Sequence, residues 1–219
     1  MNTRTATYVR PVAVLHWACA LLILAAFPLG IYMHDLPLSP EKLRLFSYHK
    51  WIGIAVLFLA VPRLLSRVAF ATPELPATMH RWERTTAVVM HVLLYALIFA
   101  VPLSGWLMSS ATGFQTWWFG VVPLPDLVSK SKPLGESLKV LHKGLNLLML
   151  GLVVVHVAAA LKHQFIDRDD VLSRMAPGRR ASGRLITASQ RPGNRMRGAA
   201  SDSSAISEAG RGADLGSSS

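Results

Sequence analysis

The sequence predicts an all-α membrane protein, a bundle of four transmembrane helices within residues 1–176. Hydrophobic residues make up 52% of the 219-residue chain, which exceeds the share typical of soluble domains. The apolar residues also gather in four stretches, each long enough to cross the hydrocarbon core of a bilayer with about 20 residues. These two observations together place the chain in the membrane class.

The first stretch, residues 11–33, contains no Asp, Glu, Lys or Arg. Its length and the lack of a small-residue cleavage site favour a retained helix over a signal peptide. The second stretch, 45–66, carries Lys50 and Arg63 near its two ends, where long side chains can reach the membrane surface.

The third and fourth predicted spans are residues 85–109 and 138–161. Pro102 lies inside the third, and proline is tolerated within transmembrane bundles. The segment between these spans, 111–136, contains several prolines and the sequence GFQTWWFG, which predicts an interfacial loop with Trp117 and Trp118 at headgroup depth. Residues 177–219 are rich in Gly, Ser, Ala and Arg, and we expect a disordered cytoplasmic tail.

The net charge of +11 reflects membrane topology rather than nucleic-acid binding, because the basic residues lie in short loops and in the tail. The N-terminus, the loop after the second span and the C-terminal segment hold 16 of the 23 Lys and Arg residues, which predicts that both termini are cytoplasmic. A single cysteine, Cys19, excludes an intramolecular disulfide and a cysteine-ligated iron–sulfur cluster, and we expect it to be a packing residue.

Two histidines in the fourth span, His142 and His156, are separated by fourteen residues. On an α-helix they lie about 40° apart around the axis and roughly 21 Å apart along it. One helix face therefore presents an imidazole near each side of the membrane. Histidines at this depth usually face a bundle interior, where a neutral imidazole can ligate a metal. This spacing fits two stacked haems.

Histidines on other spans fall at the same two depths. With cytoplasmic termini, His16 shares the inner level with His156, and His49 shares the outer level with His142. Two axial imidazoles per iron leave no open coordination position, which suits electron transfer. Zinc is less favoured, because no Cys, Asp or Glu joins either pair. Gly residues at 53, 105, 144 and 151 could admit a flat macrocycle or a neighbouring helix.

Two further histidines lie near the inner level. His91, in the third span, competes with His16 for the inner haem, and otherwise would lie beside the haem as a supporting group. His163 follows His156 by seven residues on the same helix face, and its expected exposed, interfacial position suits a hydrogen bond to a quinone. A plain surface histidine is an equal alternative. We assign no catalytic residue.

Five sequence blocks carry a family resemblance: LHW around His16, YHKWIGI around His49, MHVLLYALIFAVPLSGWLM around His91, LHKGLNLL around His142, and HVAAALKHQFIDRDDVLSRMAP from His156. Over approximately residues 8–177 the chain resembles the bacterial cytochrome b561 family, which is related to the cytochrome b subunits of hydrogenases and formate dehydrogenases.

The resemblance implies a four-helix bundle in the inner membrane with two b-type haems, ligated by His16, His49, His142 and His156. It also implies exchange with ubiquinone near the cytoplasmic side, with His163 at the position of a quinone-contacting histidine. Close relatives have a second histidine directly after that position, where this sequence has Gln164. Some members of the family look like superoxide oxidases that pass electrons to ubiquinone.

Three functions follow as alternatives. The first is a self-contained quinone reductase with superoxide as donor, which the basic outer loops would attract; these lysines could equally anchor the helices at lipid headgroups. The second is an electron-transfer subunit that relays electrons between a partner dehydrogenase and the quinone pool. The third, a transporter, is disfavoured because the chain has no inverted repeat and no mid-membrane carboxylate.

Overall fold

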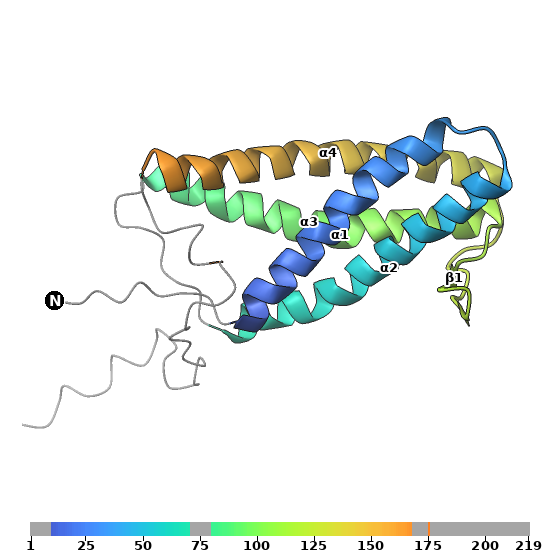
Figure 1. Cartoon of the computed structure of the whole chain (residues 1–219), viewed down its shortest axis with the longest axis horizontal. Helices are drawn as coiled ribbons and strands as arrows, with labels where there is room; N and C mark the ends of the chain where they lie inside the picture. Colours follow the sequence, from blue (N-terminus) through green and yellow to red (C-terminus); the bar gives the residue numbers. More distant parts are fainter. Residues whose placement is uncertain (1–9, 71–79, 168–174, 176–219) are drawn as a thin grey trace, which may run out of the picture. The chain divides into compact units, whose positions relative to one another are not determined.

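The computed structural model describes residues 10–70, 80–167 and 175, and four long helices account for most of them (Figure 1). They are α1 (Arg10–Asp35), α2 (Pro40–Ala69), α3 (Arg81–Thr112) and α4 (Lys132–Phe165). Each is long and apolar enough to cross a membrane, and each contains one of the predicted spans. The predicted four-helix membrane fold is confirmed, whereas the tail 177–219 lies outside the described residues.

Local signals set the helix boundaries. Only residues 36–39 separate α1 from α2, so these two helices form an antiparallel hairpin. The Ser39 side chain accepts a hydrogen bond from the Lys42 amide at 3.2 Å, and Pro40 occupies the first turn, where its missing N–H costs nothing. α3 ends at Gly113, whose positive φ of 79° is a conformation that glycine adopts readily.

The loop between α3 and α4 contains a small hairpin that the sequence did not predict. Strand β1 (Trp117–Trp118) pairs antiparallel with β2 (Val122–Pro123). The indole nitrogen of Trp51, on α2, donates a hydrogen bond to the Trp117 carbonyl at 2.6 Å. This hydrogen bond fixes the hairpin against the N-terminal half of α2.

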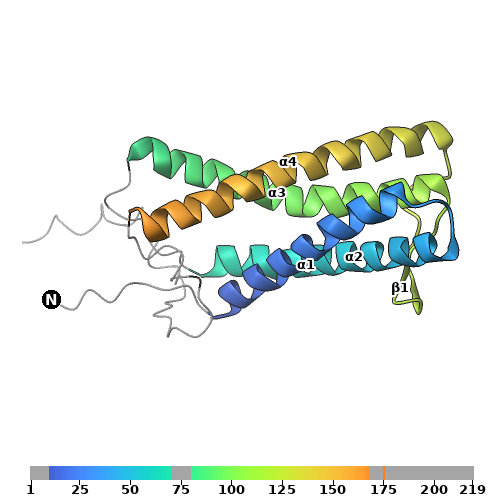
Figure 2. The ribbon, with the colours of Figure 1, turned by 45° about the horizontal axis from the view of Figure 1, so that its top comes forward.

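Neighbouring helices pack in chain order: α1 along α2, α2 with α3, and α3 along α4 (Figures 1 and 2). Four buried side chains from the first three helices form the core cluster: Cys19, Val56, Ala60 and Ile98. Cys19 is 2% exposed, as expected for a packing residue. Many large apolar side chains point outward instead, including Leu21, Phe58 and Val140, which suits a surface surrounded by lipid.

Within the described residues, α1 and α4 share no extensive backbone contact. Of the 34 residues of α4, four are buried: Gly135, Leu138, Met149 and His163. The two helices approach each other instead through histidine side chains, which form the candidate site.

Candidate functional site

The outer imidazole pair joins α2 to α4. The ring centres of His49 and His142 are 6.4 Å apart, and their planes are nearly perpendicular, at 89°. Both side chains are partly buried, and the Nδ1 atom of His49 is buried without a hydrogen-bond partner among the described residues. The structure therefore brings together the two histidines that the depth argument placed at one level.

Each ring of this pair rests on a glycine of the neighbouring helix. A Cβ atom built on Gly30, in α1, would lie 3.1 Å from Cε1 of His49. A Cβ atom on Gly105, in α3, would lie at the same distance from Cε1 of His142. Because such separations are shorter than normal carbon–carbon contacts, any larger residue would push the imidazole away. Gly30 and Gly105 thus set the position of the two rings.

Hydrogen bonds fix the tautomer of His142. Its Nδ1 atom lies 3.1 Å from the carbonyl oxygen of Val101 and 2.9 Å from the hydroxyl of Ser104. A carbonyl only accepts, so Nδ1 carries the proton and Nε2 keeps its lone pair. Metal-ligating histidines are commonly oriented by such a bond from the other ring nitrogen. His142 is therefore prepared to ligate through Nε2.

The inner pair joins α1 to α4. The ring centres of His16 and His156 are 6.3 Å apart, with planes at 62°. Nδ1 of His16, like that of His49, is buried and has no hydrogen-bond partner in the described structure. The inner pair thus matches the outer pair in ring-centre separation and, like it, joins α4 to a helix of the α1–α2 hairpin.

His91 is a third imidazole at the inner level. Its ring centre lies 5.4 Å from that of His156, and its Nδ1 atom donates a hydrogen bond to the Ala87 carbonyl at 2.6 Å. The structure thus places all three predicted inner histidines together. The distance between ring centres nevertheless differs: His91 lies closer to His156 than His16 does.

Both cross-bundle separations fit a haem iron between the rings. A bond from metal to imidazole nitrogen is about 2 Å and the ring centre lies about 1 Å beyond the nitrogen, so two rings on opposite sides of one iron have centres roughly 6 Å apart. The pairs at 6.3 and 6.4 Å meet this requirement. The 5.4 Å separation of His91 from His156 is shorter. The residues present therefore fit two haems, each held by one imidazole from α4.

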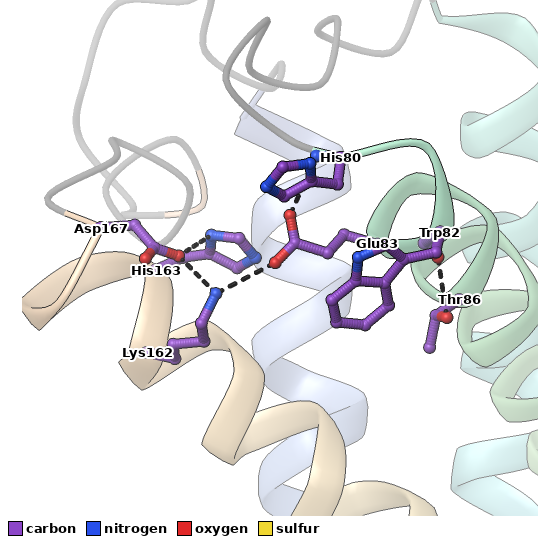
Figure 3. Close-up of polar contacts among 7 residues, drawn as sticks. All are labelled: His80, Trp82, Glu83, Thr86, Lys162, His163 and Asp167. Atoms are coloured by element: carbon purple, nitrogen blue, oxygen red, sulfur yellow. Dashed lines mark hydrogen bonds and ion pairs between the residues drawn. The ribbon is translucent and has the colours of Figure 1, made fainter.

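His163 occupies a different environment from the exposed one that the sequence predicted. The residue is only 9% exposed, and its Nδ1 atom lies 2.9 Å from Oδ2 of Asp167 (Figure 3). The expected exposure was therefore wrong: the side chain is buried, and Asp167, four residues further along the chain, is within contact distance of it. Beside it, Oε1 of Gln164 is buried and unpaired within the described residues.

Lys162 connects this end of α4 to the start of α3. Its ammonium group lies 3.1 Å from Glu83 and 2.9 Å from Asp167 (Figure 3). Glu83 also accepts a hydrogen bond at 3.0 Å from the backbone amide of His80, which caps α3. The hydrogen bond from Lys162 lowers the pKa of the Asp167 carboxyl below its ordinary value. Asp167 is therefore an ionised acceptor for His163 at neutral pH.

The glycine predictions were only partly informative. Gly105 makes the predicted close approach, to His142, whereas Gly53, Gly144 and Gly151 have no described neighbour within 4 Å of a built Cβ atom. Gly30 and Ser104 were missed, although Gly30 lies in an apolar run as an obvious small residue. Which glycine meets which ring depends on helix rotation, and the sequence pattern does not specify it.

At the opposite end of the bundle, two of the basic residues hold loops. The Lys42 ammonium donates to the carbonyl oxygens of His34, at 3.2 Å, and Leu36. The Lys50 ammonium donates to the Phe114 carbonyl at 3.0 Å. These two lysines therefore have contacts within the protein, which neither the donor-attracting nor the headgroup-anchoring interpretation described.

The chain is similar in sequence to several known cytochromes. Residues 7–178 match the family model described as prokaryotic cytochrome b561. The chain is 34% identical over 170 residues to cytochrome b561 homolog 2 of Escherichia coli K12, covering 74% of this chain and 87% of that protein. It is 30% identical to cytochrome b562 of Cereibacter sphaeroides, covering 79% and 97%. It is 28% identical to the probable superoxide oxidase CybB of Yersinia pestis, covering 76% and 93%.

A family match over most of the chain, together with four membrane-spanning helices, gives the class of the protein. Membership implies b-type haem and electron transfer in a bacterial membrane. The chain belongs to the prokaryotic cytochrome b561 family.

Proposed function

We propose that the chain carries electrons across the bacterial inner membrane through two b-type haems. His49 and His142 would be the axial ligands of the outer haem, and His16 and His156 those of the inner haem. The observation that supports this proposal most directly is that two imidazole pairs, at opposite ends of α4, have similar ring-centre separations of 6.4 and 6.3 Å. A haem iron with two imidazole ligands exchanges single electrons and has no open position for oxygen.

The ligand positions define a path. His142 and His156 are separated by roughly 21 Å along α4, which brings the two haems onto one helix and within electron-transfer reach of each other. With both termini in the cytoplasm, the outer pair faces the periplasm and the inner pair faces the cytoplasm. Most of the Lys and Arg residues lie on the side of the membrane where both termini are placed, and this excess supports the orientation.

Ubiquinone is the proposed partner at the inner end. His163, two turns beyond His156 on α4, lies beside the ionised Asp167, and the adjacent Gln164 has a buried unpaired oxygen. An imidazole hydrogen-bonded to a carboxylate can deliver a proton toward a quinone oxygen and be oriented while doing so. Lys162 keeps Asp167 in place through the 2.9 Å contact.

Superoxide is the proposed donor at the outer end. The resemblance to a probable superoxide oxidase supports this choice. So do the basic residues at this end other than Lys42 and Lys50, which are Arg44, Lys130, Lys132, Lys139 and Lys143. A net positive surface raises the local concentration of a small anion. The relay for a partner dehydrogenase is the competing function.

Two measurements test the proposal. The purified protein should contain two haems per chain, with the bis-imidazole spectra of six-coordinate iron. Rapid mixing of the oxidised protein with superoxide should then reduce the haems, and quinone should reoxidise them. Haem reduction only in the presence of a co-purified dehydrogenase would favour the relay instead, and absence of haem would exclude both functions.

A further inference from the structure

A charged side chain on α2 lies at the level of the inner imidazole pair. Arg63 is six residues from the end of α2, about 9 Å along the helix. Its guanidinium carbon lies 5.2 Å from the centre of the Tyr95 ring on α3, and its Nε atom is buried. Tyr95 in turn packs against the core cluster that contains Cys19. The head of Arg63 therefore points into the bundle, and not to the membrane surface as the sequence suggested.

The described part of the chain supplies no carboxylate for Arg63. None of the ion pairs between described residues includes it, and its buried Nε atom has no hydrogen-bond acceptor there. At the same end of the bundle, Glu83 and Asp167 both contact Lys162. An unpaired guanidinium inside a membrane protein is costly, and such groups usually mark the position of an anion.

The position of Arg63 indicates where that anion lies. Tyr95 lies about one turn after His91 on α3, and Cys19 lies about one turn after His16 on α1, so the guanidinium beside Tyr95 lies near the level of the inner imidazoles. The proposed inner haem would lie between two of these rings, and a b-type haem carries two carboxylate side groups. The planar fork of a guanidinium matches a carboxylate, and the Tyr95 ring beneath it restricts its orientation.

We propose that Arg63 pairs with a carboxylate of the haem held between His16 and His156, and so holds that haem and raises its reduction potential. This inference rests on the proposed function, since it requires an inner haem. The charge acts on the potential because the reduced haem carries one more negative charge than the oxidised haem, so a nearby cation favours reduction. A phosphate group of a lipid offers similar chemistry and is the alternative source of the anion.

Redox titration of three variants tests the pairing. Arg63→Gln removes the charge, Arg63→Lys keeps it, and Arg44→Gln makes the same change at the outer end of α2, where Arg44 is exposed. In Arg63→Gln we expect the ratio of reduced to oxidised inner haem, at the wild-type midpoint, to fall about tenfold, which is 59 mV for one electron. The variant should also lose haem faster on washing in detergent. Arg63→Lys should restore most of the ratio, and Arg44→Gln should leave the inner haem unchanged.

Several results would overturn the pairing. One is an unchanged inner-haem potential in Arg63→Gln, and another is an equal shift in Arg44→Gln. A shift that appears in phospholipid but vanishes in a phosphate-free maltoside detergent would assign the anion to lipid. If Arg63→Gln does not fold, Arg63→Lys provides the test. Loss of the inner haem from Arg63→Lys would show that Arg63 only packs against Tyr95, whereas retention of the inner haem would support the pairing. A wild-type protein without an inner haem would instead contradict the proposed function.

Discussion

His16 and His91 compete for the same partner, His156, and the distance between ring centres distinguishes them. The His16 ring lies at 6.3 Å and the His91 ring at 5.4 Å, while the outer pair, for which there is no competitor, lies at 6.4 Å. The agreement between the first and last values favours His16 as the ligand. His91, bonded to the Ala87 carbonyl, would then modify the surroundings of the haem.

We therefore predict different haem contents for two variants. His91→Ala should retain two haems per chain, with at most a shifted inner potential. His16→Ala should lose the inner haem or leave it five-coordinate and able to bind carbon monoxide, because one axial ligand is missing. Haem stoichiometry and carbon monoxide difference spectra of the two proteins decide the matter. Carbon monoxide binding by His91→Ala, and not by His16→Ala, would reverse the assignment.

The second residue-scale prediction concerns the glycine beneath His142. In Gly105→Ala the new methyl carbon would meet Cε1 of His142 at 3.1 Å, so the ring must move by a few tenths of an ångström. We expect an altered spectrum and a faster loss of the outer haem, while the inner haem is an internal control. Gly30→Ala, which displaces His49 in the same way, should affect the same haem.

Equal responses of the two haems to Gly105→Ala would contradict this interpretation. If Gly105→Ala changed the inner haem as much as the outer one, the substitution would be acting through the packing of α3 and not through the imidazole. The proposal that each outer ring is positioned by its own glycine would then fail.

At the scale of single elements, the end of α4 combines His163 and Asp167 into one unit. We predict that His163→Ala slows reoxidation of the haems by quinone several-fold while both haems stay bound, because the proposed proton donor is lost. His34→Ala, a histidine at the opposite end of the bundle, is the matched control. Single-turnover mixing of the reduced protein with quinone measures the rate, and an unchanged rate would leave His163 a structural residue.

The pH dependence of this unit follows from Asp167. Its pKa is lowered, chiefly by the hydrogen bond from Lys162, so the contact with His163 is complete above the ordinary carboxyl pKa of about 3.9 and is lost only as the pH falls through the lowered value. The carboxylate of Asp167 should therefore stay ionised between about pH 5.5 and 8, and Asp167→Asn should slow quinone reoxidation throughout this interval. A variant that matched the wild-type rate at any pH in the interval would contradict the contribution of Asp167.

The depth of each histidine could be predicted from sequence, but its neighbours could not. Depth depends on the rise per residue, which is the same for every α-helix, so His49 and His142 were placed at one level correctly. Helix rotation and tilt depend on packing against other helices, and a single sequence does not specify them. Helix rotation therefore determines three features of the structure: the contact of His142 with Gly105, the hydrogen bond between His142 and Ser104, and the inward position of Arg63.

Chain ends and turns produced the other differences. The strands at Trp117–Trp118 and Val122–Pro123 are too short to give a pattern, and they depend on a hydrogen bond from the distant Trp51. The contact of His163 with Asp167 depends on the course of the chain after α4 ends at Phe165. Both features are contacts between segments, and hydrophobic periodicity carries no information about them.

For the whole molecule, the two ends have different proposed partners, and charge distinguishes them. If superoxide is the donor at the basic outer end, its rate of haem reduction should fall as ionic strength rises, because salt screens the attraction. Quinone is neutral, so the rate of reoxidation should change little. Stopped-flow mixing at low and high salt measures both rates. A superoxide rate that is independent of salt would assign the outer lysines to anchoring alone.

The order of helix packing also bears on how the protein is made. α1 and α2 form one hairpin, α3 packs along α4, and each proposed haem takes one imidazole from each half: His49 or His16 from the first, His142 or His156 from the second. An iron bonded to both rings is then a cross-link between halves that share little direct contact between their outer helices. Production of the protein should consequently follow the supply of haem: cells blocked in haem synthesis should accumulate little of the chain, because membrane proteases would degrade a bundle whose halves are held mainly by the packing of α2 against α3.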